Sequence, residues 1–265
     1  MTIITWLTDF GTQDSYVAEM KGSFWRVFQH QAGPNASAPV LIDITHEVPP
    51  WDIERGAWLL GEAFPSFPPG TIHVGVVDPG VGSARKPIIL QAQDHFFIGP
   101  DNGLFSRPAL ADPRHRIYEI PLVGSEVSDT FHGRDIFSPA AAEIAASGFQ
   151  TSRYLPLKTM VILKELEPVF EAGIWRGRIV HEDRFGNLTT NLPGEIWLRI
   201  PGASLQVAAH ELTLLVRTFS EAPAEQASLI INSNGYLEII SPNASAAAKL
   251  HAVPGTPVFI KEKQP

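Results

Sequence analysis

Short apolar runs of strand type alternate with amphipathic stretches of helical spacing through the first part of the chain, and this alternation limits the possible folds more than any other feature. We expect strands at residues 3–7, 39–44, 71–77, 87–91 and 95–98, and helices at residues 15–28, 51–64 and 136–146. Strands that alternate with helices of this length are typical of an α/β layer built on a mostly parallel sheet.

The chain changes character after Lys158. A polar segment at residues 163–168 has the composition of a linker. Short β-type runs follow, and only residues 244–251 show a helical pattern; the expected strands are residues 174–180, 196–200, 212–216, 228–231, 236–240 and 258–261. The sequence therefore predicts an α/β domain over residues 1–165 and a smaller β-barrel domain over residues 166–265.

Composition excludes several classes of protein. The formal net charge is −8 and the basic residues form no cluster, which argues against a nucleic-acid partner. There are no cysteines, so disulfides, thiolate metal sites and a cysteine nucleophile are excluded. The first residues lack the pattern of a signal peptide, and no apolar run approaches the ~20 residues that span a bilayer. We therefore expect a cytoplasmic protein with no membrane partner.

Polar and glycine-rich clusters follow several expected strands, where ligands bind in open α/β sheets. Asp9 can accept hydrogen bonds from ribose hydroxyls, or it can cap the next helix. Asp78 and Arg85 frame a glycine turn, which is open to a ligand role or to a plain turn with a surface ion pair. Asn102 lies in a further strong turn signal.

A fourth cluster, at residues 130–139, contains His132 and Asp135. Asp135 is open to a plainer role as a negative charge at a helix N-terminus. The nine histidines contain no His-Glu-x-x-His or His-x-His pair, so we expect no metal site. In the β-rich part, residues 183–191 and 232–236 have the pattern of hairpin turns.

The joint order of these clusters resembles the S-adenosylmethionine hydroxide adenosyltransferase family, the adenosine-forming S-adenosylmethionine hydrolases related to the fluorinase and chlorinase. The resemblance covers nearly the whole chain. Its seven motifs are Thr8-Asp9-Phe10-Gly11; Tyr16-Val17 with Met20-Lys21-Gly22; Pro50-Trp51-Asp52; Val77-Asp78-Pro79-Gly80-Val81-Gly82 with Arg85; Gly99-Pro100-Asp101-Asn102-Gly103-Leu104; Phe131-His132-Gly133-Arg134-Asp135; and Asp183-Arg184-Phe185-Gly186-Asn187 with Asn232-Ser233.

The resemblance implies hydrolysis of S-adenosylmethionine to adenosine and L-methionine, by attack of water on the ribose C5′ carbon in line with sulfur and without a cofactor. It assigns the attacking water to the catalytic residues Asp78, Arg85 and His132. The substrate-binding residues that it implies are Asp9 for the ribose, Trp51 for ring stacking, and Asn102, Asp183, Phe185, Asn187 and Ser233. It also implies a homotrimer with the substrate at subunit interfaces.

This chain departs from the related halogenases at several positions. Asn234 stands where the fluorinase has Arg, and Asp183 lies one residue closer to the Phe-Gly-Asn motif. A Tyr of the halogenases matches Asp78, and a carboxylate about 4 Å from a halide ion would repel it by ~4 kcal/mol at an effective dielectric constant of about 20. Gly133 occupies the place of the fluorinase's halide-binding Ser.

Two other functions are compatible with the resemblance: a 5′-halogenase, and a sensor that binds an adenosyl ligand without turnover. The carboxylate of Asp78 argues against halide binding. A sensor needs no set of water-activating residues, so the presence of Asp78, Arg85 and His132 argues against that function too. The sequence therefore favours hydrolysis.

Overall fold

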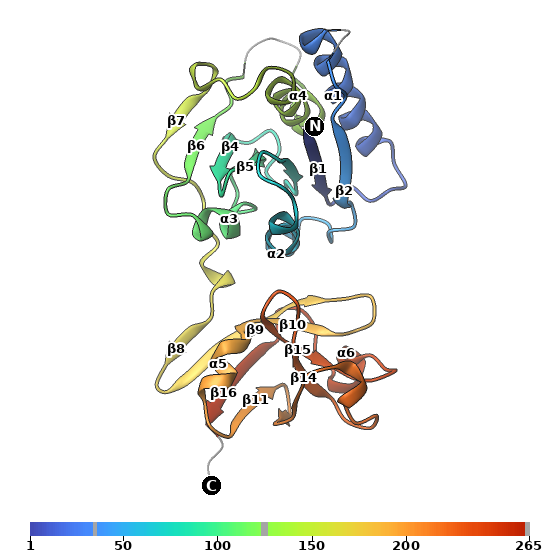
Figure 1. Cartoon of the computed structure of the whole chain (residues 1–265), viewed down its shortest axis with the longest axis vertical. Helices are drawn as coiled ribbons and strands as arrows, with labels where there is room; N and C mark the ends of the chain where they lie inside the picture. The colour runs from blue at the N-terminus through green and yellow to red at the C-terminus, as the bar shows by residue number, and fades with distance from the viewer. Residues whose placement is uncertain (34–35, 123–126, 263–265) are drawn as a thin grey trace. The chain divides into compact units, whose positions relative to one another are not determined.

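The computed structural model describes residues 1–33, 36–122 and 127–262. The chain forms two compact units, Met1–Leu163 and Lys164–Pro265 (Figure 1). Each unit has its own sheet and its own apolar core.

Unit 1 contains a seven-stranded mixed sheet in the order β2-β1-β3-β5-β4-β6-β7. Its strands are β1 (Ile3–Thr8), β2 (Val40–Thr45), β3 (Ile72–Val76), β4 (Pro87–Ala92), β5 (His95–Pro100), β6 (Arg116–Glu119) and β7 (Leu155–Leu157). The pairs β1–β2, β1–β3 and β3–β5 are parallel, whereas β4–β5, β4–β6 and β6–β7 are antiparallel. The expected mostly parallel sheet is therefore found only in its first half. The second half reverses because Gln93 and Asp94, both at positive φ, make a two-residue hairpin turn between β4 and β5.

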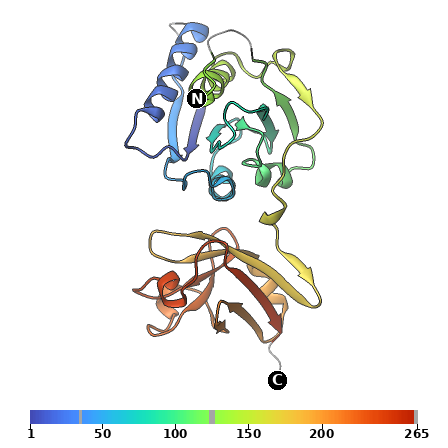
Figure 2. The same ribbon diagram turned by 180° about the vertical axis from the view of Figure 1, so that it is seen from behind.

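Helices cover both faces of this sheet, as the two opposite views show (Figures 1 and 2). Helices α1 (Tyr16–Ala32) and α4 (Ser138–Ser147) share one core cluster, where Phe24 packs edge-on against Trp6 of β1. Helices α2 (Ile53–Ala63) and α3 (Ser106–Ala111) contribute to the opposite cluster, which contains Leu7 of β1. Successive β1 residues thus face alternate cores, as strand geometry requires. A π-helical turn, Gly133–Phe137, leads into α4.

Unit 2 contains a nine-stranded sheet with the path β12-β11-β16-β9-β10-β15-β14-β13, and β8 pairs with β9. Its strands are β8 (Val169–Glu171), β9 (Ile174–Glu182), β10 (Leu188–Pro193), β11 (Ala203–Val207), β12 (His210–Leu212), β13 (Leu215–Val216), β14 (Ser228–Ile231), β15 (Tyr236–Ile240) and β16 (Pro257–Glu262). Among the residues that the structure describes, the pairings form an open path. Closure into a barrel therefore stays a prediction.

Two expectations for unit 2 are wrong. Residues 196–200 are not a strand, because Gly194–Arg199 forms helix α5. Its buried Ile196 and Trp197 face the core, and Arg199 reaches back to Glu195 at 2.9 Å on the exposed side. The expected strand at 212–216 is split between β12 and β13, which lie at opposite ends of the sheet path. The expected helix near residue 246 is confirmed as α6 (Ala246–Leu250).

Candidate active site

Asp78, Arg85 and His132 form one buried cluster just beyond the end of β3. Arg85 Nε donates to Asp78 Oδ1 at 3.0 Å, and Arg85 Nη2 donates to Asp78 Oδ2, so the guanidinium holds both carboxylate oxygens. The two side chains are only 9% and 5% exposed. The surface ion pair considered from the sequence is therefore wrong, because this pair is shielded from water. A bidentate contact of this kind also fixes the plane of the carboxylate.

The same guanidinium determines the protonation state of the histidine. Arg85 Nη2 lies 2.7 Å from His132 Nδ1. Because a guanidinium can only donate, Nδ1 must be the acceptor, and the ring proton of His132 is then on Nε2. Burial lowers the pKa of His132, and the positive charge of Arg85 lowers it further. His132 is thus a neutral imidazole that offers an Nε2–H donor.

Asn102 braces the strand end that carries Asp78. Its side-chain nitrogen donates to the carbonyl of Val77 at 2.8 Å, and its side-chain oxygen accepts from the amide of Leu104 at 3.2 Å. Both ends of the amide are therefore engaged inside the protein. The expected contact of Asn102 with the substrate stays a prediction, and the structure adds an internal contact to the residue directly before Asp78.

The turn that carries His132 is clamped from several sides. Arg134 donates to both oxygens of Asp135, at 2.7 and 3.1 Å, and to Glu19 of α1 at 3.0 Å. Asp135 also accepts from the amide of Ser128 at 3.0 Å. Hydrogen bonds from Arg134 lower the pKa of Asp135. Asp135 is therefore more than a charge at a helix terminus: it ties the π-helical turn to the preceding segment at Ser128, and such turns are frequent at functional sites.

Asp9 and Trp51 are joined by a direct contact. Asp9 Oδ2 accepts from the backbone amide of Trp51 at 2.9 Å. The helix-capping role considered for Asp9 is wrong, because α1 begins only at Tyr16. Burial raises the pKa of Asp9, and the negative charge of nearby Asp78 raises it further. The carboxylates of Asp9 and Asp78 are therefore within electrostatic range of each other.

Trp51 itself has two unusual properties. Its φ of 65° lies in the left-handed region, which a bulky residue rarely adopts. Its side chain is 73% exposed. Backbone strain and an uncovered indole ring together are typical of a ligand platform rather than of a core residue.

In unit 2, Asp183 organises the turn between β9 and β10. Its Oδ1 accepts from the amides of Phe185 and Asn187 at 2.9 and 2.8 Å, and its Oδ2 accepts from the Asn187 side chain at 2.9 Å. The expected hairpin turn is confirmed by a bond from the Asp183 amide to the Asn187 carbonyl at 3.0 Å. Asp183 thus orients Asn187, and Phe185 is left 78% exposed.

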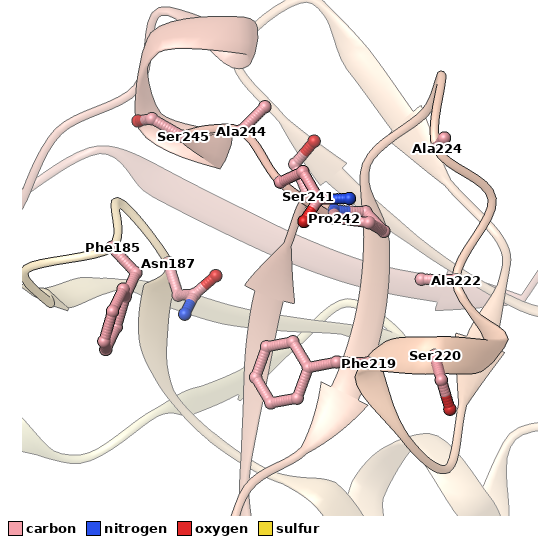
Figure 3. A pocket seen from close by; sticks show the side chains of 11 residues that line it. Phe185, Asn187, Phe219, Ser220, Ala222, Ala224, Ser241, Pro242, Ala244 and Ser245 are labelled. Atoms are coloured by element: carbon pink, nitrogen blue, oxygen red, sulfur yellow. The ribbon is translucent and has the colours of Figure 1, made fainter.

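Phe185 and Asn187 line a concavity of about 870 Å³ (Figure 3). Phe219 faces them from a short 3₁₀ turn, Phe219–Glu221. Residues that the sequence did not identify complete the lining: Phe219, Ser220, Ala222, Ala224, Ser241, Pro242, Asn243, Ala244 and Ser245. They carry no spacing signal, because three separate segments supply the lining. Ser233 is not part of it and lies exposed in the β14–β15 turn.

The structure places the expected site residues in separate groups. In unit 1 it brings together Asp78, Arg85 and His132, the residues expected to be catalytic, and it joins Asp9 to Trp51. In unit 2 it joins Asp183, Phe185 and Asn187, with Ser233 apart from their concavity.

Comparison with known proteins identifies the family. The sequence model of the SAM hydroxide adenosyltransferase N-terminal domain matches residues 4–153, and that of the C-terminal domain matches residues 177–259. The chain belongs to the SAM hydroxide adenosyltransferase family. Within it, an (R)-S-adenosyl-L-methionine hydrolase of Methanocaldococcus jannaschii is 34% identical over 90% of this chain and 88% of its own length. The hydrolase of the same name from Thermus thermophilus is 34% identical over 97% of this chain and 99% of its own length.

More distant members and solved structures fit the same assignment. A fluorinase of an Actinoplanes species is 26% identical over 97% of each chain. A crystal structure of an uncharacterized conserved protein from Thermotoga maritima has a TM-score of 0.86 and 31% identity, and the match covers 98% of this chain and 100% of that chain. Within the described ranges, no helix is long and apolar enough to cross a membrane.

Proposed function

We propose that this chain hydrolyses S-adenosyl-L-methionine to adenosine and L-methionine, with Asp78, Arg85 and His132 as its catalytic residues. The observation that carries the proposal is the buried cluster in which one guanidinium holds both Asp78 and His132. The names of the relatives with about a third identity support the reaction.

The proposed reaction is a single displacement. A water molecule lies between Asp78 and the ribose C5′ carbon, opposite the sulfonium. Its oxygen bonds to C5′ while the C5′–S bond breaks, and the electron pair of that bond stays on sulfur, which becomes the neutral thioether of methionine. One water proton passes to Asp78 and then to solvent. His132 donates through Nε2–H and orients the water. Positioning of this kind can supply roughly 7–11 kcal/mol of the barrier at most.

The cluster supports water over halide as the nucleophile. Asp78 keeps a buried negative charge on the nucleophile's side, which repels an anion. At Gly133, the proposed counterpart of the halide-binding Ser, an added Cβ would lie 3.0 Å from the sulfur of Met20. Gly133 supplies no hydroxyl donor to a halide, and a Ser there would require the Met20 side chain to shift by a few tenths of an ångström. Both features favour hydrolysis over the halogenase alternative.

We further propose that Asp9 binds the ribose hydroxyls and that Trp51 stacks on the substrate. The unit 2 concavity fits a purine, because the exposed rings of Phe185 and Phe219 offer flat apolar faces and the Asn187 amide can pair with ring nitrogens (Figure 3). Ser233 is proposed as an additional contact to the amino-acid end.

The proposed assembly is a cytoplasmic homotrimer in which unit 2, as a barrel-type domain, completes the site of a neighbouring subunit. Mixed trimers test this arrangement. Asp78→Asn and Asn187→Ala proteins, each poorly active, should regain partial activity when they are refolded together, because some sites then combine two intact halves. Full activity of protein that light scattering shows to be monomeric would overturn this arrangement.

One assay tests the reaction itself. Purified protein is incubated with S-adenosyl-L-methionine in H₂¹⁸O, and the products are separated by chromatography and weighed by mass spectrometry. The expected products are L-methionine and adenosine with ¹⁸O in the 5′-hydroxyl. Methylthioadenosine, S-adenosylhomocysteine, or no turnover by folded protein over hours would overturn the proposal.

A further inference from the structure

The turn that carries Asp9 is tied to the segment after β2 by contacts that no sequence motif indicated. The amide of Gly11 donates to the carbonyl of His46 at 2.7 Å, and the amide of Val48 donates to the carbonyl of Thr8 at 3.3 Å. Asp9 then accepts from the Trp51 amide a few residues further along. The two segments are therefore hydrogen-bonded to each other, and the side chain of His46, in the second segment, contacts Thr8 in the first.

His46 links these two segments to a series of side-chain contacts. Its Nδ1 lies 2.9 Å from Thr8 Oγ1, and both side chains are buried. Its Nε2 lies 3.1 Å from Asp43 Oδ1 and has no well-formed hydrogen bond, so this contact is electrostatic. Lys21 of α1 donates to the other oxygen of Asp43 at 2.7 Å.

The direction of each contact follows from the charges. Burial acts to raise the pKa of Asp43, but the contacts from Lys21 and His46 outweigh it and leave the pKa lower than usual, so Asp43 is a carboxylate. A carboxylate favours a proton on His46 Nε2, which leaves Nδ1 as an acceptor for the hydroxyl of Thr8. The oxygen of Thr8 is then free to accept from the amide of Phe10 at 3.3 Å. Each group in the chain thus orients the next, from α1 to the peptide beside Asp9.

We propose that His46 is a positioning residue for nucleoside binding: held between Asp43 and Thr8, it sets the backbone that carries Asp9 and, through Asp9, the platform of Trp51. This rests on the proposed function only for the roles of Asp9 and Trp51. Loss of these side-chain contacts then weakens binding of the nucleoside. The chemical step is unaffected, because Asp78 is held by contacts of its own.

The same strand provides a matched control. Thr5 of β1 makes an equivalent contact, with Oγ1 at 2.7 Å from Nδ1 of buried His73, and His73 in turn contacts His95 at 3.1 Å. This second series of contacts ends in the core rather than at the Asp9 turn. Thr8→Val and Thr5→Val therefore each remove a threonine hydroxyl from a buried Thr–His pair, at two different places in the fold.

The experiment measures steady-state kinetics with S-adenosyl-L-methionine and calorimetric binding of adenosine. We expect Thr8→Val and His46→Leu to raise the KM and the adenosine Kd about tenfold, which corresponds to about 1.4 kcal/mol, with kcat within about twofold of wild type. Thr5→Val and His73→Leu should leave KM and Kd unchanged. Thr8→Ser, which keeps the hydroxyl, should restore wild-type values.

Hydrogen exchange gives a readout that does not depend on turnover. The amides of Phe10, Gly11 and Trp51 should exchange faster in Thr8→Val than in Thr5→Val. Unchanged exchange at these amides, or equal KM values for Thr8→Val and Thr5→Val, would overturn the role of His46. The proposed function is tested separately by adenosine release from the wild-type protein, and the exchange result stands whichever way that assay turns out.

Discussion

Arg85 donates a hydrogen bond to His132 Nδ1 at 2.7 Å with the same nitrogen that grips Asp78. Since the guanidinium has no lone pair to offer, the imidazole nitrogen that faces it cannot hold a proton. His132 is therefore a donor at its other nitrogen, and Asp78 is the one group of the cluster able to take a proton from water. In the proposed reaction, Asp78 and His132 therefore have different roles.

Removal of the Asp78 charge should abolish most turnover. Asp78→Asn keeps the shape of the side chain but not its basicity, so we expect kcat to fall by about 10²–10⁴-fold, with a smaller change in KM. Asp129→Asn, an exposed carboxylate in the neighbouring loop, is the matched control and should stay near wild type. Wild-type kcat for Asp78→Asn in a single-turnover assay would contradict the mechanism.

The pH profile should report His132. Its pKa is lowered in the folded protein, so the neutral donor form is present at neutral pH and is lost only as the pH falls below about 6.5. Activity should thus be level above neutral pH and decline in acid, as protonation breaks the contact with Arg85. The measurement is kcat/KM from pH 5 to 8. In His132→Gln, which does not titrate, the rate should be lower and the decline shallower.

Asn102 should behave as a support for Asp78 rather than as a ligand contact. Asn102→Asp replaces the donor that faces the Val77 carbonyl with an acceptor, which displaces the strand end. We expect kcat to fall about tenfold, the size expected for loss of a hydrogen bond of roughly 1.4 kcal/mol, with KM nearly unchanged. A rise in KM at constant kcat would instead make Asn102 a substrate-binding residue.

Stability should fall in acid because of the buried pair of His73 and His95. Burial lowers the pKa of His73 to about 3, whereas an unfolded histidine titrates near 6.5. In the unfolded chain, His73 therefore binds a proton below pH 6.5. In the folded chain, it binds this proton only at about pH 3. Between pH 7.5 and 5 this costs about 2 kcal/mol of unfolding free energy. Urea denaturation at several pH values measures it, and His73→Asn should flatten this part of the curve.

No halogenated nucleoside should form in chloride or fluoride at millimolar concentration, because Asp78 repels anions from the nucleophile's position. Chromatography of reactions with and without halide is the check. Asp78→Tyr is the informative variant, tested in the reverse direction with 5′-chloro-5′-deoxyadenosine and methionine. Detection of 5′-halo-adenosine from the unaltered protein would contradict the assignment to hydrolysis.

Many of the strands and helices could be predicted because the apolar periodicity of each segment indicates them. The strands β1 to β5 and the helices α1, α2 and α4 lie close to their expected ranges. The reversal of the sheet at β4 was not predictable from apolar periodicity, which does not report strand direction. Helix α5 was missed for a related reason: a short apolar run such as Ile196–Trp197 fits a buried strand and a buried helix turn equally well.

By itself, the sequence indicated which residues we propose for the chemistry, because the joint order of its glycine-rich turns resembles a known family and places Asp78, Arg85 and His132 in those turns. Only the tertiary structure showed which contacts each of them makes. It showed that the possible surface ion pair is buried, gave Asn102 a partner at Val77, and placed His46 against Thr8, the residue before Asp9. Hydrogen bonds between residues far apart in the chain leave no spacing pattern, so the fold had to bring them together before donor and acceptor roles could be assigned.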